Sequence, residues 1–143
     1  MIVTVKHNFE TAHRLPFLAG KCENIHGHSW WVEWEFDNEM DDNGLTLEYG
    51  ALKRALRSWV DEHLDHGTML GAKDKLLEAF RKDGSKVYIF GEDYTEFPWP
   101  TVEAVSSLLA SVAIDLIGVE PISVKVQETH VNAAVWRVGH DRA

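Results

Sequence analysis

Apolar and polar side chains alternate in two stretches near the start of the chain. In residues 2–10, Val3, Val5 and Phe9 share one side with His7. The alternation is clearer in residues 27–37, where one side carries His28, Trp30, Val32, Trp34 and Phe36. Because successive side chains of a strand point to opposite faces, both stretches predict strands with one buried face.

Two longer stretches repeat their apolar residues at helical spacing instead. Residues 49–63 place a row of apolar side chains on one side, which predicts an amphipathic helix. A second long helix is predicted to begin at Thr101, just after Pro100, and to end before Gly118. Its buried stripe consists of Val102, Val105, Leu108, Leu109, Val112 and Leu116.

The remaining segments predict smaller elements. They are a short helix in residues 75–81, an extra strand in 86–90, a loop in 91–100, and two final strands in 122–128 and 133–138. The predicted order is two strands, two long helices with an insertion between them, and two strands. A chain of 143 residues fits one domain, so we expect a single α+β domain over residues 1–143.

Composition and charge narrow the classes of function. The net charge of −9 argues against a nucleic-acid partner, which requires a basic face. No stretch of about 18 apolar residues occurs, so no membrane span is expected. The first residues lack the layout of a signal peptide and Cys22 is the only cysteine, so we expect a cytoplasmic protein without disulfides. An anionic small substrate remains compatible with this net charge. Arg14 and Lys21 could face such a substrate or could simply be solvated.

Three histidines and one cysteine lie close together before and within the second predicted strand. His26 and His28 are two residues apart and would point to the same face of a strand, while His13 can join them from a neighbouring strand. Three imidazoles on zinc leave one position open for substrate, which is the pattern of catalytic rather than structural zinc sites. Cys22 could then serve as a base, a nucleophile or a fourth ligand.

Two later segments of the sequence also contain residues that could take part in catalysis or substrate binding. Asp65 precedes His66 after the first long helix, and an aspartate can orient an imidazole that carries protons. The alternative is an ordinary helix C-terminal region. Glu128 ends a hydrophobic strand, where its carboxylate could accept two N–H bonds from an amino-pyrimidine ring or simply be solvated.

Together these residues resemble the 6-pyruvoyltetrahydropterin synthase family, including its bacterial branch of 6-carboxytetrahydropterin synthases. The resemblance covers nearly the whole chain. Its motifs are Phe9-Glu10-Thr11-Ala12-His13-Arg14-Leu15, Cys22-x-x-x-His26-Gly27-His28, Leu64-Asp65-His66, Pro100-Thr101-Val102-Glu103 and Glu128-Thr129. The gap of three residues between Cys22 and His26 resembles the carboxy branch.

The resemblance implies a tunnelling fold, in which a four-stranded antiparallel sheet carries two long helices on one face. Subunits would close into a barrel as trimers, and two trimers would form a homohexamer with active sites between subunits. The implied roles are zinc ligands for His13, His26 and His28, general base for Cys22, acid/base pair from a neighbouring subunit for Asp65 and His66, pterin anchor for Glu128, and substrate contact for Thr101.

The implied reaction converts 7,8-dihydroneopterin triphosphate to 6-carboxy-5,6,7,8-tetrahydropterin, with release of acetaldehyde and triphosphate, in 7-deazaguanine (queuosine-type) synthesis. Three alternatives stay open. One is a 6-pyruvoyltetrahydropterin synthase. Another is cleavage to 6-hydroxymethyldihydropterin, which some relatives perform with a glutamate at the position of Glu23. The third is a non-enzymatic zinc module that Cys22 closes as fourth ligand. The chain departs from the family's usual residues at Glu48-Tyr49-Gly50, after Asp65-His66, and at His130-Val131-Asn132.

Overall fold

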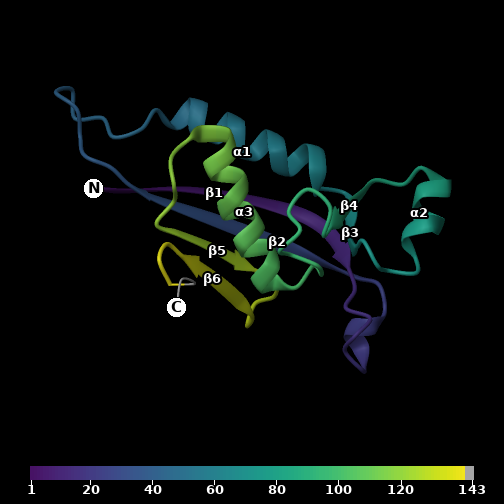
Figure 1. The fold of residues 1–143 in the computed structure, drawn as a ribbon. Coiled ribbons are helices and arrows are strands. Elements are labelled where there is room, and N and C mark those ends of the chain that lie inside the picture. Colours follow the sequence, from purple (N-terminus) through teal and green to yellow (C-terminus); the bar gives the residue numbers. More distant parts are fainter. Residues whose placement is uncertain (141–143) are drawn as a thin grey trace.

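The computed structural model describes residues 1–140 and forms one sheet with helices against it (Figure 1). The elements are β1 Ile2–His13, a 3-10 turn η1 Lys21–Glu23, β2 His26–Asp37, α1 Tyr49–His63, β3 Gly67–Gly71, α2 Leu77–Asp83, β4 Val87–Phe90, α3 Val102–Ile117, β5 Ser123–Gln127 and β6 Ala133–Arg137. The α+β prediction and the two long helices are confirmed.

The sheet has six strands in the order β4-β3-β1-β2-β5-β6, so the expected four-stranded antiparallel sheet is wrong in extent. The four expected strands β1, β2, β5 and β6 do pair antiparallel. However, β3 pairs parallel with β1, and β4 pairs parallel with β3. The segment of β3, Gly-Thr-Met-Leu-Gly, has too little alternation to predict a strand, and its pairing with β1 is what makes it one.

The core lies between one face of the sheet and the helices α1 and α3, which cover the same side in Figure 1. The alternation of β2 puts Trp30, Val32, Trp34 and Phe36 on this face, and all are buried. The indole nitrogen of Trp34 donates to the carbonyl of Leu109, 3.1 Å away, and so ties β2 to α3. The predicted faces of both early strands are therefore confirmed.

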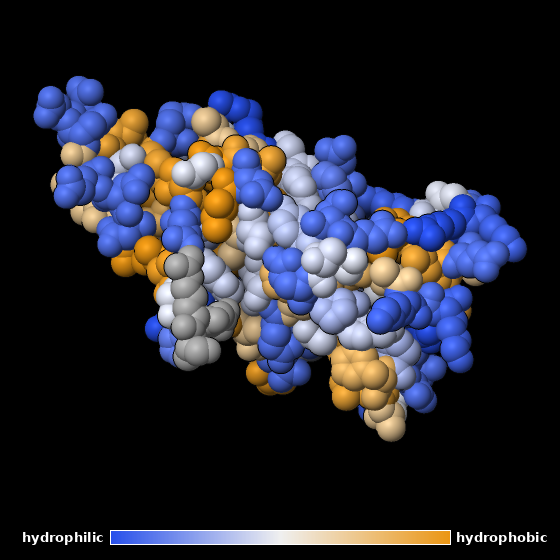
Figure 2. Space-filling view, viewed as in Figure 1, coloured by the Kyte–Doolittle hydropathy of each residue, from blue (hydrophilic) through white to orange (hydrophobic). Residues whose placement is uncertain are grey.

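The surface is largely polar on the face that Figure 2 views, with apolar areas at the upper left and at the lower right. Exposed apolar side chains of the segment between β1 and β2 are Phe17, Leu18 and Ile25. On the opposite face of the sheet from the core, Trp31 is half exposed.

No helix in the described part of the chain has the length and apolar character needed to cross a bilayer.

Thr101 begins α3 as its N-cap. Its hydroxyl oxygen accepts a hydrogen bond from the backbone N–H of Ala104 at 3.0 Å, and its backbone is extended while the next residue is helical. Such a side chain satisfies one of the first N–H groups of the helix, which have no partner within it. The predicted start of the second long helix is thus confirmed, with a structural role for Thr101.

We expect Thr101→Ala to lower the free energy of unfolding by about 1 kcal/mol, because an alanine cannot cap the helix. Urea unfolding at a fixed protein concentration measures this. Thr101→Ser keeps the hydroxyl and should unfold close to the wild type. Equal stability of the alanine variant and the wild type would show that the cap contributes nothing.

Candidate metal centre and active site

The register of β1 against β2 brings the three predicted histidines together. His13 lies opposite His26, and Thr11 lies opposite His28. All three imidazoles therefore emerge at one end of the strand pair, on the face that the helices cover. One ligand nitrogen from each lies within 4.8 Å of the others, and the ring centres are 4.6 to 5.3 Å apart. The predicted cluster is confirmed as a geometry that a metal ion fits.

Backbone carbonyls fix which ring nitrogen of two of these histidines is free. The Nδ1 atom of His13 lies 2.7 Å from the carbonyl oxygen of Pro100, and Nδ1 of His26 lies 2.8 Å from that of Asn24. A carbonyl can only accept, so each Nδ1 carries a hydrogen, and in the neutral imidazole each Nε2 keeps its lone pair. This arrangement orients imidazoles for metal binding.

The burial of the cluster also supports metal binding. The Nε2 atoms of His13 and His28 are buried nitrogens that make no hydrogen bond within residues 1–140. Burial lowers the pKa of His28 below its ordinary value, which favours the neutral imidazole that a metal requires. Three neutral imidazoles fit zinc and leave a fourth position for another ligand.

Trp30 packs against the cluster from within the core. Its ring is fully buried and lies edge-on to His13 and His28, at centroid distances of 4.9 and 5.5 Å. Its indole nitrogen donates to the carbonyl of Thr11 at 3.0 Å. The indole therefore limits the orientations available to two of the three imidazoles.

Glu128 follows β5 by one residue, and strand alternation puts it on the same face as the buried Val124 and Val126. Its Oε1 atom lies 3.1 Å from Nε2 of His13 and 3.5 Å from Nε2 of His28. A hydrogen bond from Nε2 of His13, formed when that nitrogen carries a proton, is the main cause that holds the pKa of the Glu128 carboxyl below its ordinary value, and it outweighs the effect of burial. Glu128 is thus an ionised group directed at the metal-competent nitrogens.

Cys22 lines a cavity of about 500 Å³ together with His13, Thr101 and Glu128. One predicted metal ligand, the predicted base and the residues predicted to contact the pterin therefore line the same cavity. Cys22 is exposed within η1, and its sulfur does not belong to the group of ligand atoms that lie within 4.8 Å of one another. This position suits a base that faces substrate better than a fourth ligand that closes the metal site.

Asp65 and His66 form a hydrogen-bonded pair. Nδ1 of His66 lies 2.8 Å from Oδ2 of Asp65, and Oδ1 of Asp65 accepts from the N–H of Glu10 at 2.8 Å. Burial raises the pKa of Asp65, but these two hydrogen bonds together with the charges of His66 and Lys86 keep the pKa below its ordinary value. The imidazole is 79% exposed and is not among the residues that line the cavity. One chain alone does not bring the pair to the metal-competent cluster.

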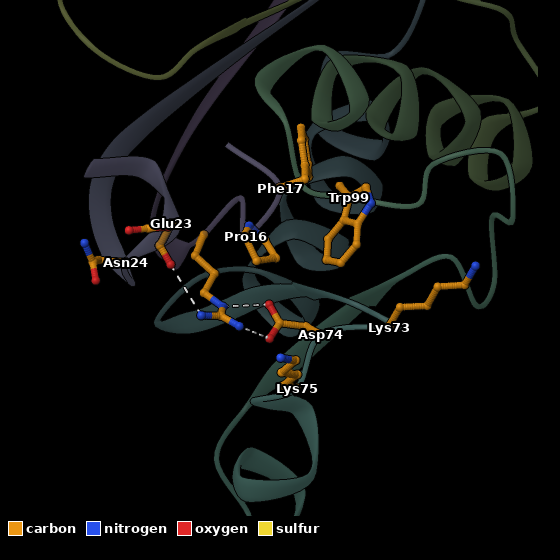
Figure 3. A pocket seen from close by; sticks show the side chains of 9 residues that line it. Pro16, Phe17, Glu23, Asn24, Lys73, Asp74, Lys75 and Trp99 are labelled. Carbon is orange, nitrogen blue, oxygen red and sulfur yellow. Dashed lines mark hydrogen bonds and ion pairs between the residues drawn. The ribbon is translucent and has the colours of Figure 1, made fainter. Parts of the chain in front are cut away.

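Arg14 binds an aspartate that sequence reasoning missed. Its guanidinium donates to both carboxylate oxygens of Asp74, at 2.8 and 2.6 Å, and the Asp74 side chain is fully buried. The pair borders a second cavity of about 510 Å³ (Figure 3), where Phe17 and Trp99 face each other and Lys73 points away from Asp74. Arg14 is therefore neutralised by an ion pair rather than free to face an anionic substrate.

Glu23 lines this second cavity and not the one that contains Cys22. Sequence reasoning also missed the carbonyls of Pro100 and Asn24, since any residue offers a carbonyl and no side-chain type signals it.

Comparison with known proteins agrees with these features. The sequence model of a family described as 6-pyruvoyl tetrahydropterin synthase matches residues 2–138. A Rickettsia felis protein named 6-carboxy-5,6,7,8-tetrahydropterin synthase is 28% identical over 109 residues, which cover 74% of this chain and 75% of the relative. A Halobacterium salinarum protein named as a probable 6-carboxy-5,6,7,8-tetrahydropterin synthase is 30% identical over 121 residues, which cover 82% and 73% of the two chains.

Solved structures share the fold. The 6-pyruvoyl tetrahydropterin synthase of Caenorhabditis elegans superimposes with a TM-score of 0.68 at 22% identity, over 96% of both chains. An uncharacterised protein from Wolinella succinogenes gives a TM-score of 0.72 at 19% identity, over 96% of this chain and 99% of the other.

We expect His26→Ala to lower the metal content of the purified protein well below one ion per chain, because it removes one of the three imidazoles of the cluster. Elemental analysis of protein purified with added zinc measures the metal content, and circular dichroism checks the fold. His140→Ala removes an exposed histidine from outside the cluster and should keep its metal. Full metal content in the His26 variant would show that the ion binds elsewhere.

Proposed function

The chain belongs to the 6-pyruvoyl tetrahydropterin synthase family, and on that premise we propose that it is a zinc-dependent 6-carboxy-5,6,7,8-tetrahydropterin synthase. Its reaction converts 7,8-dihydroneopterin triphosphate and one water to 6-carboxytetrahydropterin, releasing acetaldehyde and triphosphate. The observation that carries the proposal is the cavity in which His13, Cys22 and Glu128 meet. The names of the relatives and the three-residue gap between Cys22 and His26 support the carboxy product.

His13, His26 and His28 would hold the zinc through their Nε2 atoms, since the Nδ1 atoms of His13 and His26 donate to carbonyls. When bound, zinc would polarise the side-chain hydroxyls of the substrate and lower their pKa. Cys22 would take a carbon-bound proton at its sulfur as a thiolate. This role requires a reduced thiol, in keeping with the cytoplasmic location expected from the sequence.

Glu128 would anchor the pterin by accepting N–H bonds from its ring, and its low pKa keeps it ionised for this purpose. Thr101 lines the same cavity. Its hydroxyl oxygen accepts from Ala104, which leaves the hydroxyl hydrogen available to a substrate oxygen. Thr101 therefore combines helix capping with substrate contact in this proposal.

His66, oriented by Asp65, would relay protons at the active site of a neighbouring subunit. Its imidazole is exposed and lies outside the cavity of its own chain. The sheet ends in β4 on one side and β6 on the other, and unpaired strand edges favour pairing with further copies of the chain. We therefore propose a homo-oligomer, a hexamer of two barrel-forming trimers, with sites shared between subunits.

The second candidate activity is that of a 6-pyruvoyltetrahydropterin synthase, which would use the same residues. Cleavage to 6-hydroxymethyldihydropterin is less favoured, because Glu23 borders the second cavity and not the one that contains Cys22. The carboxy product would feed 7-deazaguanine synthesis.

Incubation of the zinc-loaded protein with 7,8-dihydroneopterin triphosphate under reducing conditions tests the product. We expect mass spectrometry to detect 6-carboxytetrahydropterin, and an aldehyde assay to detect acetaldehyde in equal amount. A pyruvoyl product without acetaldehyde would establish the second candidate instead, and 6-hydroxymethyldihydropterin would assign a role to Glu23.

Subunit mixing tests the shared site. We expect Cys22→Ala and His66→Ala each to abolish turnover. Unfolding and refolding the two variants together should restore roughly a quarter of wild-type activity, because that share of sites in a symmetric oligomer would pair an intact Cys22 with an intact His66. Each variant refolded alone is the control. No recovery in the mixture would place both residues in the site of one chain.

A further inference from the structure

The contact between Glu128 and the histidines has an unusual chemical character. Because Nδ1 of His13 donates to the Pro100 carbonyl, Nε2 of the neutral imidazole presents a lone pair to Oε1 of Glu128 at 3.1 Å. Two acceptors at that distance repel each other unless a metal ion or a proton lies between them. The same oxygen lies 3.5 Å from Nε2 of His28, which is also buried without a hydrogen bond in the described chain.

The separations of Oε1 from His13 and His28 match a shared metal ion. Glu128 does not belong to the group of ligand atoms that all lie within 4.8 Å of one another, so its carboxylate has to turn toward His26 to complete the site. Zinc binds imidazole nitrogen and carboxylate oxygen at about 2.0–2.1 Å, so two ligand atoms at neighbouring corners of a tetrahedron lie about 3.3 Å apart. The two distances from Oε1, 3.1 and 3.5 Å, lie on either side of that value. The side chain of Glu128 is 17% exposed, so little water competes for its charge.

Neighbouring atoms hold the carboxylate in this place. The backbone N–H of Glu128 donates to the carbonyl of Asn132 at 3.0 Å, and the hydroxyl of Thr129 accepts from the N–H of Asn132 at 3.0 Å. The turn after β5 is thus closed by its own hydrogen bonds. It presents Glu128 on the sheet face that carries His28.

We propose that Glu128 is the fourth ligand of the metal in the substrate-free protein, through Oε1. The site is then three imidazoles and one carboxylate, closed at rest. This inference deepens the proposed function, on which it rests for the second task of Glu128. The carboxylate has to leave the metal before both of its oxygens can accept N–H bonds from a pterin, so substrate opens the site that it uses.

Metal affinity in the absence of substrate tests the inference. We expect Glu128→Gln to raise the dissociation constant for zinc by about tenfold or more, as loss of a group that contacts or orients a metal does. Competition with a chromogenic chelator measures the constant. Glu103→Gln is the matched control, since Glu103 lines the same cavity without an ion pair to the histidines in residues 1–140 and should leave the constant unchanged.

Cobalt in place of zinc provides a second readout. The visible absorption of the substrate-free cobalt protein should change in band position and intensity in Glu128→Gln and remain as in the wild type in Glu103→Gln. If Glu128→Gln keeps both the zinc constant and the cobalt spectrum, Glu128 is not a ligand and the contact with His13 holds a proton. Loss of turnover with unchanged metal binding would overturn this inference and leave the proposed function standing. Weakened metal binding together with a different product would support this inference and overturn the proposed function.

Discussion

The register of β1 against β2 is the constraint on which both the core and the candidate site depend. It sets His13 opposite His26 and Thr11 opposite His28, so that the three imidazoles share one face and one end of the strand pair. A slip by one residue would turn every side chain of one strand to the other face. Such a slip would also expose Trp30 and Trp34, which are fully buried, and large aromatic side chains are costly to return to water. The core thus enforces the geometry of the metal-competent cluster.

The parts of the fold that follow from local pattern were predictable. Alternation located β1 and β2, and helical spacing located α1 and α3, with Thr101 predicted at the start of α3. The cluster of His13, His26 and His28 was predictable for the same reason, because two of its members are two residues apart on a strand whose face the apolar residues already define.

The parts that depend on contacts between distant segments were not predictable. Gly67–Gly71 becomes a strand only because β1 and β4 lie on either side of it. The lone pair of His13 is set by the carbonyl of Pro100, far along the chain, and the pairing of Arg14 with Asp74 joins two loops. The direction of the Glu128 side chain depends on where β5 joins the sheet. No residue type at these positions indicates which group it contacts, so these contacts can be identified only in the folded structure.

The backbone of His66 adopts a conformation that costs stability. Its φ angle of 58° lies in the left-handed region, which costs most residues with a Cβ about 1 kcal/mol but costs glycine nothing. This conformation lets the backbone N–H of His66 donate to Glu10 while the imidazole reaches Asp65. A glycine there would suit the turn better and would remove the imidazole. Selection for thermal stability alone would therefore favour loss of the histidine, and a strained backbone at this position fits the proton-relay role proposed for His66.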